Sequence, residues 1–311
     1  MQQTLSDQLL SRSNGRPWLS DGGLETAMIF LEGLDLPGFA SFPLLETAEG
    51  KTALQRYFRK MLDTAREHET GLILSTATWR ASRGWGPSLG LTDDQIDEAS
   101  RRSVAFAESL RDEYPDVPIL IEGVLGPHGD AYAPDRVLTA EEARDYHRPQ
   151  IRVLAEAGVD FIGAYTLSST GEAIGIAEAA REVQIPVLLS FTVETDGRLV
   201  SGMTLAEAIA QTDAATGSYA AWYGINCAHP DHFREHLHGK WTSRIGSIRA
   251  NASRLSHAEL DEATELDAGD PQELARDYAR LLEILPSVRV IGGCCGTDHR
   301  HIAAIGAACL T

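Results

Sequence analysis

The stretch Val290-Ile291-Gly292-Gly293-Cys294-Cys295-Gly296-Thr297-Asp298, near the end of this 311-residue chain, decides the fold. Its apolar start, together with Val288, predicts a buried strand over 288–291. The glycines that follow let the backbone turn sharply and lie close to whatever the cysteines hold. Neighbouring thiols at the end of a strand favour a metal held by thiolates, provided that a third soft ligand comes from elsewhere.

A second segment, 223–230, offers that third ligand. Cys227 ends a hydrophobic strand predicted over 220–226 and follows Asn226 directly. The sequence therefore predicts that the fold brings Cys227 to Cys294 and Cys295. The alternatives are three buried structural cysteines, or a disulfide between the two adjacent cysteines.

Strands and helices alternate along the whole chain. Further strands are predicted over 18–23, 71–76, 118–123, 159–166, 186–191 and 244–250, and helices over 47–69, 93–111, 139–157, 171–183, 204–215 and 271–285. Continuous apolar strands separated by helices indicate a parallel sheet covered on both faces. Roughly eight such units favour an α/β fold of the (β/α)8 TIM-barrel type, as a single domain over 1–311. No Gly-x-Gly-x-x-Gly follows an early strand, so the dinucleotide-binding alternative lacks its main signal.

A barrel of this type brings the carboxyl ends of its strands to one face. Polar, aromatic and sulfur-containing residues stand at or just beyond the predicted strand ends. We therefore expect one site at that face, formed by Asp21, Trp79, Glu122, Tyr165, Cys227, Asn251, Cys294 and Cys295.

Charge and composition exclude several classes of function. The formal net charge of −18 argues against a nucleic-acid-binding surface or an anchor for acidic membranes, and it suits a cationic small substrate. The polar start, 1–14, predicts neither a signal peptide nor a spanning helix. Four cysteines in a chain this long argue against a disulfide framework and favour a reducing, cytoplasmic location.

With these features the sequence resembles the zinc-dependent homocysteine S-methyltransferase family, which includes betaine– and S-methylmethionine–homocysteine methyltransferases. The resemblance rests on Asp21-Gly22-Gly23, Gly126-Pro127, Asn226-Cys227 and Gly292-Gly293-Cys294-Cys295-Gly296-Thr297, which span nearly the full chain in the family's order. It implies a modified (β/α)8 barrel in which Cys227, Cys294 and Cys295 bind zinc. It also implies that Asp21 and Gly22 lie beside the homocysteine site.

The sequence departs from the family at one position. Family members carry a Glu-Thr pair at the end of the fourth strand, and that Glu is associated with the amino group of homocysteine. Here the pair is Tyr165-Thr166. A phenol cannot supply the charge of a carboxylate at neutral pH. We hypothesise that Glu122 takes over this contact, and the alternative is that the acceptor is not ordinary homocysteine.

Three thiolate ligands suit one kind of zinc chemistry. A substrate thiol bound at the open fourth position is held as an electron-rich thiolate, which favours alkyl transfer over hydrolysis. The methyl donor should then be an onium compound, a sulfonium or a quaternary ammonium. Aromatic faces bind such cations, and the candidates are Trp79, Trp85, Tyr165 and Trp222. Thr166 and Asn226 are further candidate substrate contacts.

The histidines after Cys227 lack the pattern of a metal site. His229, His232, His236 and His238 are not part of a His-Glu-x-x-His motif, so a solvated helix is the simpler interpretation. Cys309, alone near the carboxyl terminus, is expected to be a small buried hydrophobe.

The sequence therefore predicts a cytoplasmic methyltransferase that moves a methyl group from an onium donor, such as S-methylmethionine or betaine, to the thiol of homocysteine. The product would be methionine and the cofactor Zn²⁺. Three alternatives stay open: another thiol acceptor, a role in demethylating the donor, or a non-catalytic zinc- or thiol-binding sensor. No heptad pattern or long extension indicates an oligomeric state.

Overall fold

The computed structural model describes residues 15–132 and 136–310, and within them eight parallel strands close into a barrel. The strands are β1 (Trp18–Ser20), β2 (Leu72–Ser75), β3 (Ile119–Leu125), β4 (Phe161–Leu167), β5 (Val187–Phe191), β6 (Trp222–Asn226), β7 (Ile245–Ala250) and β8 (Val290–Gly293). They follow each other around the barrel in chain order, and β1 pairs with β8 to close it. The expected (β/α)8 fold is confirmed.

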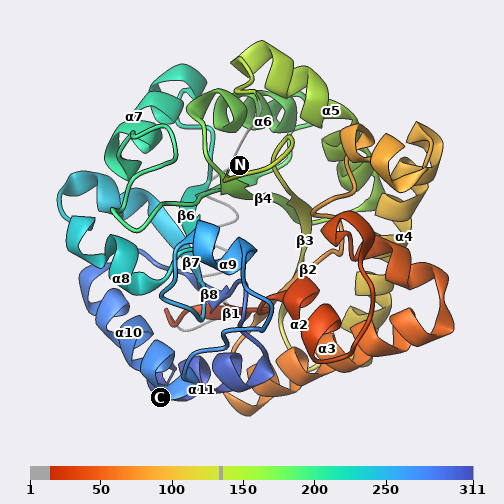
Figure 1. The fold of residues 1–311 in the computed structure, drawn as a ribbon, viewed down its shortest axis with the longest axis horizontal. Coiled ribbons are helices and arrows are strands. Elements are labelled where there is room, and N and C mark those ends of the chain that lie inside the picture. Colours follow the sequence, from red (N-terminus) through yellow and green to blue (C-terminus); the bar gives the residue numbers. More distant parts are fainter. Residues whose placement is uncertain (1–14, 133–135, 311) are drawn as a thin grey trace.

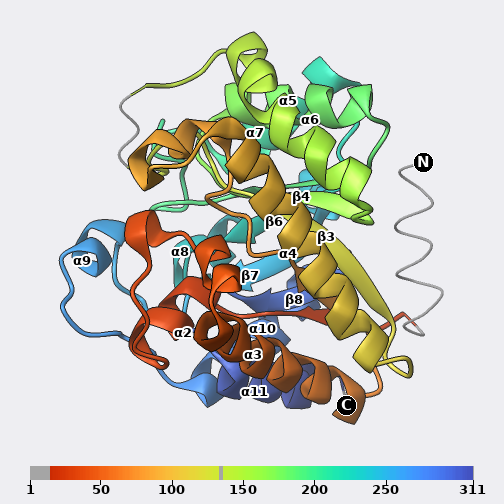
Figure 2. The same ribbon diagram turned by 90° about the vertical axis from the view of Figure 1, so that its right-hand side faces the viewer.

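Helices form a ring outside the strands (Figure 1). They are α3 (Ala48–Glu67), α4 (Asp93–Glu113), α5 (Ala140–Ala157), α6 (Thr170–Glu182), α7 (Leu205–Thr216), α8 (Pro230–Phe233), α10 (Pro271–Ile284) and α11 (His299–Cys309). Two short helices, α2 (Leu24–Phe30) and α9 (His257–Asp261), lie over one end of the barrel instead (Figure 1 and Figure 2). None of the described helices combines the length and the apolar character that crossing a bilayer requires. The polar segment 1–14 lies outside the described residues.

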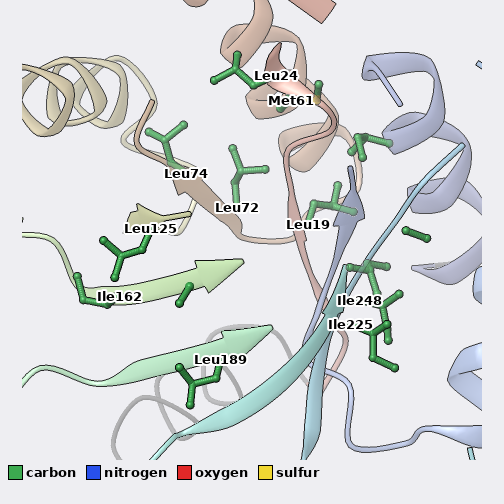
Figure 3. Packing of buried hydrophobic residues seen from close by; sticks show 14 of the residues in the cluster. Leu19, Leu24, Met61, Leu72, Leu74, Leu125, Ile162, Leu189, Ile225 and Ile248 are labelled. Carbon is green, nitrogen blue, oxygen red and sulfur yellow. The ribbon is translucent and has the colours of Figure 1, made fainter. Parts of the chain in front are cut away.

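Each strand buries both of its faces, as parallel strands in a barrel do. One face fills the barrel interior with large side chains, among them Trp18, Leu120, Phe161, Leu188, Trp222 and Val290. The other face packs on the helices through residues such as Leu19, Leu72, Ile162 and Leu189 (Figure 3). This alternation explains why the predicted strands read as continuous apolar runs.

Several helices begin at a threonine that caps the first turn. Thr92, Thr139 and Thr204 each accept a hydrogen bond from the backbone three residues on, and the glutamine or glutamate there bonds back. These caps account for the starts of the helices predicted over 93–111 and 139–157. These caps fix where each helix leaves its loop at the carboxyl end of the preceding strand.

The structure also contains helices that the sequence analysis missed. The segments that form α2, α9 and α11 were not predicted to be helical, whereas α8 lies in the histidine segment interpreted as a helix. The apolar spacing of these segments is short or irregular, and α11 begins only because Asp298 caps it through the backbone N–H of Arg300. The last strand, expected over 288–291, is instead Val290–Gly293. Figure 2 shows α2 and α9 at the same end of the barrel.

Candidate metal centre and active-site cavity

Three cysteines lie together where β6 and β8 end. Cys227 directly follows β6, and Cys294 and Cys295 directly follow β8. One sulfur atom from each cysteine lies within 4.8 Å of the other two. The structure joins Cys227 and Cys294, whose Cα atoms are 5.3 Å apart, in a disulfide, and leaves Cys295 a free thiol. The pairing differs from the adjacent-cysteine disulfide considered as an alternative.

The sulfur cluster fits a soft metal ion. Thiolates are preferred ligands of zinc and other soft ions, and no carboxylate or imidazole among the described residues joins this cluster. Because a ligating cysteine must be a thiolate, the Cys227–Cys294 disulfide and a metal-loaded form exclude each other. Once reduced, the three sulfurs are close enough to hold one ion together.

Glycines at the end of β8 allow this approach. A Cβ at Gly292 would lie 1.9 Å from Ser20 Oγ on β1, and one at Gly293 would lie 2.0 Å from Thr297 Oγ1. The first contact would push β8 away from β1, and the second would distort the loop that carries Cys294 and Cys295. Only glycine fits at these two positions, which explains the doublet before Cys294.

Cys227 itself has a left-handed backbone with φ of 53°. Such a conformation costs a non-glycine residue on the order of 1 kcal/mol, so other contacts must hold it. The carbonyl oxygen of Cys227 accepts a bond of 2.6 Å from Nε2 of His257 and one of 3.1 Å from Nδ2 of Asn251. These two hydrogen bonds hold the backbone of Cys227 in its left-handed conformation.

Two polar side chains contact the sulfurs. Thr166 Oγ1 lies 3.9 Å from Cys227 Sγ, and Asn226 Nδ2 lies 3.9 Å from Cys294 Sγ. Asn226 also bonds both the hydroxyl and the backbone N–H of Thr166, at 3.0 and 2.9 Å. The structure therefore places Thr166 and Asn226 beside the cysteines, where they orient the sulfurs.

The cysteines lie in a cavity of about 480 Å³ at the carboxyl end of the barrel. Several residues singled out in the sequence line it: Asp21, Gly22, Trp79, Tyr165, Thr166, Asn226, Cys227, Asn251, Cys294 and Cys295. Glu122, Trp85 and Trp222 are not among the lining residues. The cavity is further covered by residues of α2, such as Glu25, and of α9, such as Leu260.

A buried charged network forms part of the cavity floor, and its centre is Arg249 on β7. The guanidinium of Arg249 donates to Asp21 Oδ1 at 2.5 Å and to Ser75 Oγ at 3.2 Å, and it lies 3.7 Å from Glu122 Oε2. The Tyr165 hydroxyl donates to Glu122 Oε1 at 2.8 Å. Arg249 therefore compensates both carboxylates, and the sequence analysis missed it. The signal was present: a single arginine stands in the otherwise apolar or small run of β7.

The hypothesis that Glu122 contacts the substrate is not supported. Its side chain is completely buried, with the Tyr165 hydroxyl bonded to it, and it does not reach the cavity. Glu122 has room because position 163 is glycine: a Cβ on Gly163 would lie 1.9 Å from Glu122 Oε1. Burial raises the pKa of Glu122 to about 7, although Arg249 opposes the shift.

This shift predicts how the stability of the protein depends on pH. The pKa of Glu122 rises from 4.5 to about 7 on folding, so the folded state holds this proton more tightly than the unfolded state. Its stabilising effect is complete below pH 4.5 and is lost as the pH rises through 7. The free energy of unfolding of the wild type should therefore fall by up to about 1.4 kcal/mol per pH unit across that window. Glu122→Gln should not show this fall.

Urea unfolding of the wild type and of Glu122→Gln at pH 5, 6, 7 and 8 would measure this difference. The exposed Glu67, at the end of α3, provides the control variant Glu67→Gln, which should follow the wild type. Parallel curves for the wild type and Glu122→Gln would contradict the prediction.

The three tryptophans proposed to bind an onium ion are placed differently from the expectation. Trp222 is buried in the barrel interior, 6.2 Å from the ring of Phe161. The guanidinium carbon of Arg80 lies 4.0 Å from the ring centroid of Trp79 and 4.0 Å from that of Trp85. Arg80 thus already stacks on Trp79 and Trp85. Trp79 lines the cavity, whereas Trp85 and Trp222 do not and are not supported as donor contacts.

The histidine expectation is wrong in part. His236 and His238 are exposed, but His229 and His232 are buried rather than solvated. His229 groups with Asp231 and Asp277 as a possible set of metal ligands. Arg234 bonds Asp277 at 3.1 Å, so positive charge already occupies this group. Burial lowers the pKa of His229 to about 4, which keeps it neutral. Cys309, expected to be buried, is partly exposed.

Known proteins are similar to this chain in sequence and in fold. Residues 18–309 match the family model described as homocysteine S-methyltransferase. Homocysteine S-methyltransferase 2 of Arabidopsis thaliana is 27% identical over 262 residues, covering 75% of this chain and 77% of that protein. Selenocysteine Se-methyltransferase of Brassica oleracea var. italica is 28% identical over 259 residues, covering 75% of this chain and 73% of that protein.

A solved structure has a similar fold over most of the chain. The metallated form of the homocysteine methyltransferase MmuM from Escherichia coli superposes with a TM-score of 0.72 at 25% identity, covering 94% of this chain and 96% of that one. The family match spans all eight strands and the three clustered cysteines. The chain therefore belongs to the homocysteine S-methyltransferase family.

Proposed function

We propose that the chain transfers a methyl group from an onium donor to the thiol of homocysteine, giving methionine, with Zn²⁺ held by Cys227, Cys294 and Cys295. The observation that carries this proposal is the gathering of three cysteine sulfurs within 4.8 Å in the cavity of a chain of this family. A zinc ion bound by three thiolates would keep a substrate thiol deprotonated and nucleophilic near neutral pH.

The chain's own residues then orient the reactants. Asn226 and Thr166 bond each other and the cysteine sulfurs, which fixes the direction from which a thiol enters. The cavity encloses the reacting atoms under α2 and α9, and exclusion of water favours transfer to sulfur over hydrolysis of the donor. Holding sulfur and methyl carbon in line supplies much of the rate.

The charges around the cavity support an onium donor. Five carboxylates line it outside the buried network: Glu25, Asp130, Asp261, Glu265 and Asp267. A positively charged sulfonium or quaternary ammonium compound is attracted to such a wall. The attraction does not depend on the aromatic cage expected from the sequence.

A selenol acceptor is a second candidate. One of the matching relatives is a selenocysteine Se-methyltransferase, 28% identical to this chain. Asp21 is bonded to Arg249, and Tyr165 stands where a carboxylate was expected, so the ammonium group of homocysteine has no free acid on the floor. Acceptors that carry selenium in place of sulfur, or that differ in the distance from this atom to the amino group, should therefore be compared directly with homocysteine.

The test uses reduced, zinc-loaded protein with homocysteine, selenohomocysteine, cysteine and selenocysteine as acceptors. The donors are S-methylmethionine, S-adenosylmethionine, glycine betaine and dimethylsulfoniopropionate, and methylated products are followed by mass spectrometry. Methionine formed from homocysteine with one of these donors supports the proposal. Faster methylation of a selenol supports the second candidate. Stoichiometric zinc with no methylated product would favour a non-catalytic zinc- or thiol-binding protein.

A further inference from the structure

Arg80 is held rigidly in the wall of the cavity. It follows β2, and its guanidinium lies between the indoles of Trp79 and Trp85, with 4.0 Å from its central carbon to each ring centroid. Its Nη1 donates to the carbonyl oxygen of Gly129 at 3.0 Å. Stacking on two aromatic faces and one hydrogen bond fix the plane and the rotation of this cation.

The charge of Arg80 is not neutralised by an ion pair, although Asp130 and Glu25 interact with it electrostatically. No carboxylate of the described residues lies within ion-pair distance of it, and its Nε is buried without a hydrogen-bond partner. Burial lowers its pKa to about 10, so it still carries its charge at neutral pH. Arg249, the other arginine of the cavity, is paired with Asp21 and Glu122. A half-buried, unpaired cation is costly, which suits a position that an anionic ligand completes.

The surroundings of Arg80 favour a ligand that carries both charges. Glu25 interacts electrostatically with Arg80 and also with Cys295, so an acid lies within range of both the cation and the sulfur cluster. A positive group beside Glu25 would be near the cysteines, while a negative group of the same molecule could reach Arg80. A zwitterion matches this pattern of charges.

We propose that Arg80 binds the carboxylate of a zwitterionic methyl donor, so that the protein selects ammonio- or sulfonio-carboxylates over onium ions without a carboxylate. This inference rests on the proposed function for its use of a methyl donor. The acceptor thiol is assigned to the floor, where Thr166 and Asn226 contact the sulfurs. Arg80 stands on a different wall, after β2 rather than after β6 or β8.

Binding of matched donors tests the inference independently of turnover. Isothermal titration calorimetry with the zinc-loaded protein would compare dimethylsulfoniopropionate with its methyl ester, and glycine betaine with choline. We expect the carboxylate forms to bind more tightly by about tenfold or more, since a hydrogen bond between charged groups is typically this strong. Arg80→Gln should remove that preference by weakening the carboxylate forms alone, and Arg80→Lys should retain part of it.

Arg83 provides the matched control. It lies three residues on, in a partly buried ion pair with Asp97 at 2.6 Å, and Arg83→Gln should leave all four affinities unchanged. Unfolding curves of Arg80→Gln verify that the variant is folded. Equal binding of acids and esters by the wild type, or an unchanged preference in Arg80→Gln, would overturn the inference. An Arg80→Gln variant that is weakened for homocysteine alone would also overturn it, by assigning Arg80 to the acceptor.

The two proposals fail in different ways. If no thiol is methylated but Arg80→Gln still loses the preference for carboxylates, the proposed function fails and the carboxylate site stands. If methionine forms equally well from the carboxylate and ester donors, the proposed function stands and the role of Arg80 is refuted.

Discussion

A Cys295→Ser variant is expected to lose its metal and its methyl transfer while the barrel stays folded. Cys295 is the free thiol of the cluster, so this exchange leaves Cys227 and Cys294 unchanged. Two thiolates and a weakly bound hydroxyl hold zinc poorly. We expect the metal content to fall from near one ion per chain to background, and transfer to fall by roughly a thousandfold or more, since a catalytic metal contributes several kcal/mol.

Metal content by mass spectrometry and methionine formation would be measured on reduced protein. Cys309 lies on α11, outside the cavity, and Cys309→Ser is the matched control that should keep both properties. If Cys295→Ser kept its zinc and its activity, the three-cysteine site would be wrong, whatever the family match. If it kept zinc but lost activity, Cys295 would act on the substrate rather than on the metal.

An Arg249→Met variant is expected to be strongly destabilised. The side chains of Arg249, Asp21 and Glu122 are 10%, 2% and 0% exposed, so solvent cannot replace the lost cation. Removing one partner of a buried ion pair leaves an uncompensated charge and typically costs about 3–5 kcal/mol. The urea midpoint at neutral pH should therefore fall sharply.

The ion pair of Arg244 with Asp213 provides the comparison. This pair is bidentate, and its side chains are 28% and 18% exposed. We expect Arg244→Met to cost on the order of 1 kcal/mol, as partly solvated pairs do. Adding Asp21→Asn and Glu122→Gln to Arg249→Met should restore much of the stability, because no buried charge then stays unpaired. Equal losses in Arg249→Met and Arg244→Met would show that the network is not the cause.

The sequence predicted the barrel because its signals are local. Apolar runs such as 186–191 and capped helix starts such as Thr139 depend on neighbouring residues only. The meeting of Cys227 with Cys294 and Cys295 followed from one topological fact, that parallel strands end on one face. Long helices and strand ends were therefore predictable, whereas the short helices α2 and α9 carry too few residues for a clear period.

The charged contacts of the site could not be predicted in the same way. Whether Glu122 reaches the cavity depends on two contacts between distant parts of the chain. The Tyr165 hydroxyl bonds its carboxylate, and Arg249 approaches the carboxylate from β7. Likewise, Trp79 and Trp85 were good candidates for binding a cation, but nothing in their spacing says that the cation is Arg80. Register and rotamers decide these contacts, and they are properties of the packed barrel rather than of a sequence window.

The close contact between Gly163 and Glu122 constrains how this chain could have evolved. A side chain at position 163 would occupy the place of the carboxylate, because even a Cβ there lies 1.9 Å from it. An ancestor could therefore accept glutamate at 122 only after position 163 had become glycine. Once the acid was in place, that glycine could no longer vary without loss of the network. An acid at 122 therefore depends on glycine at 163, and among related chains the two residues should be inherited together.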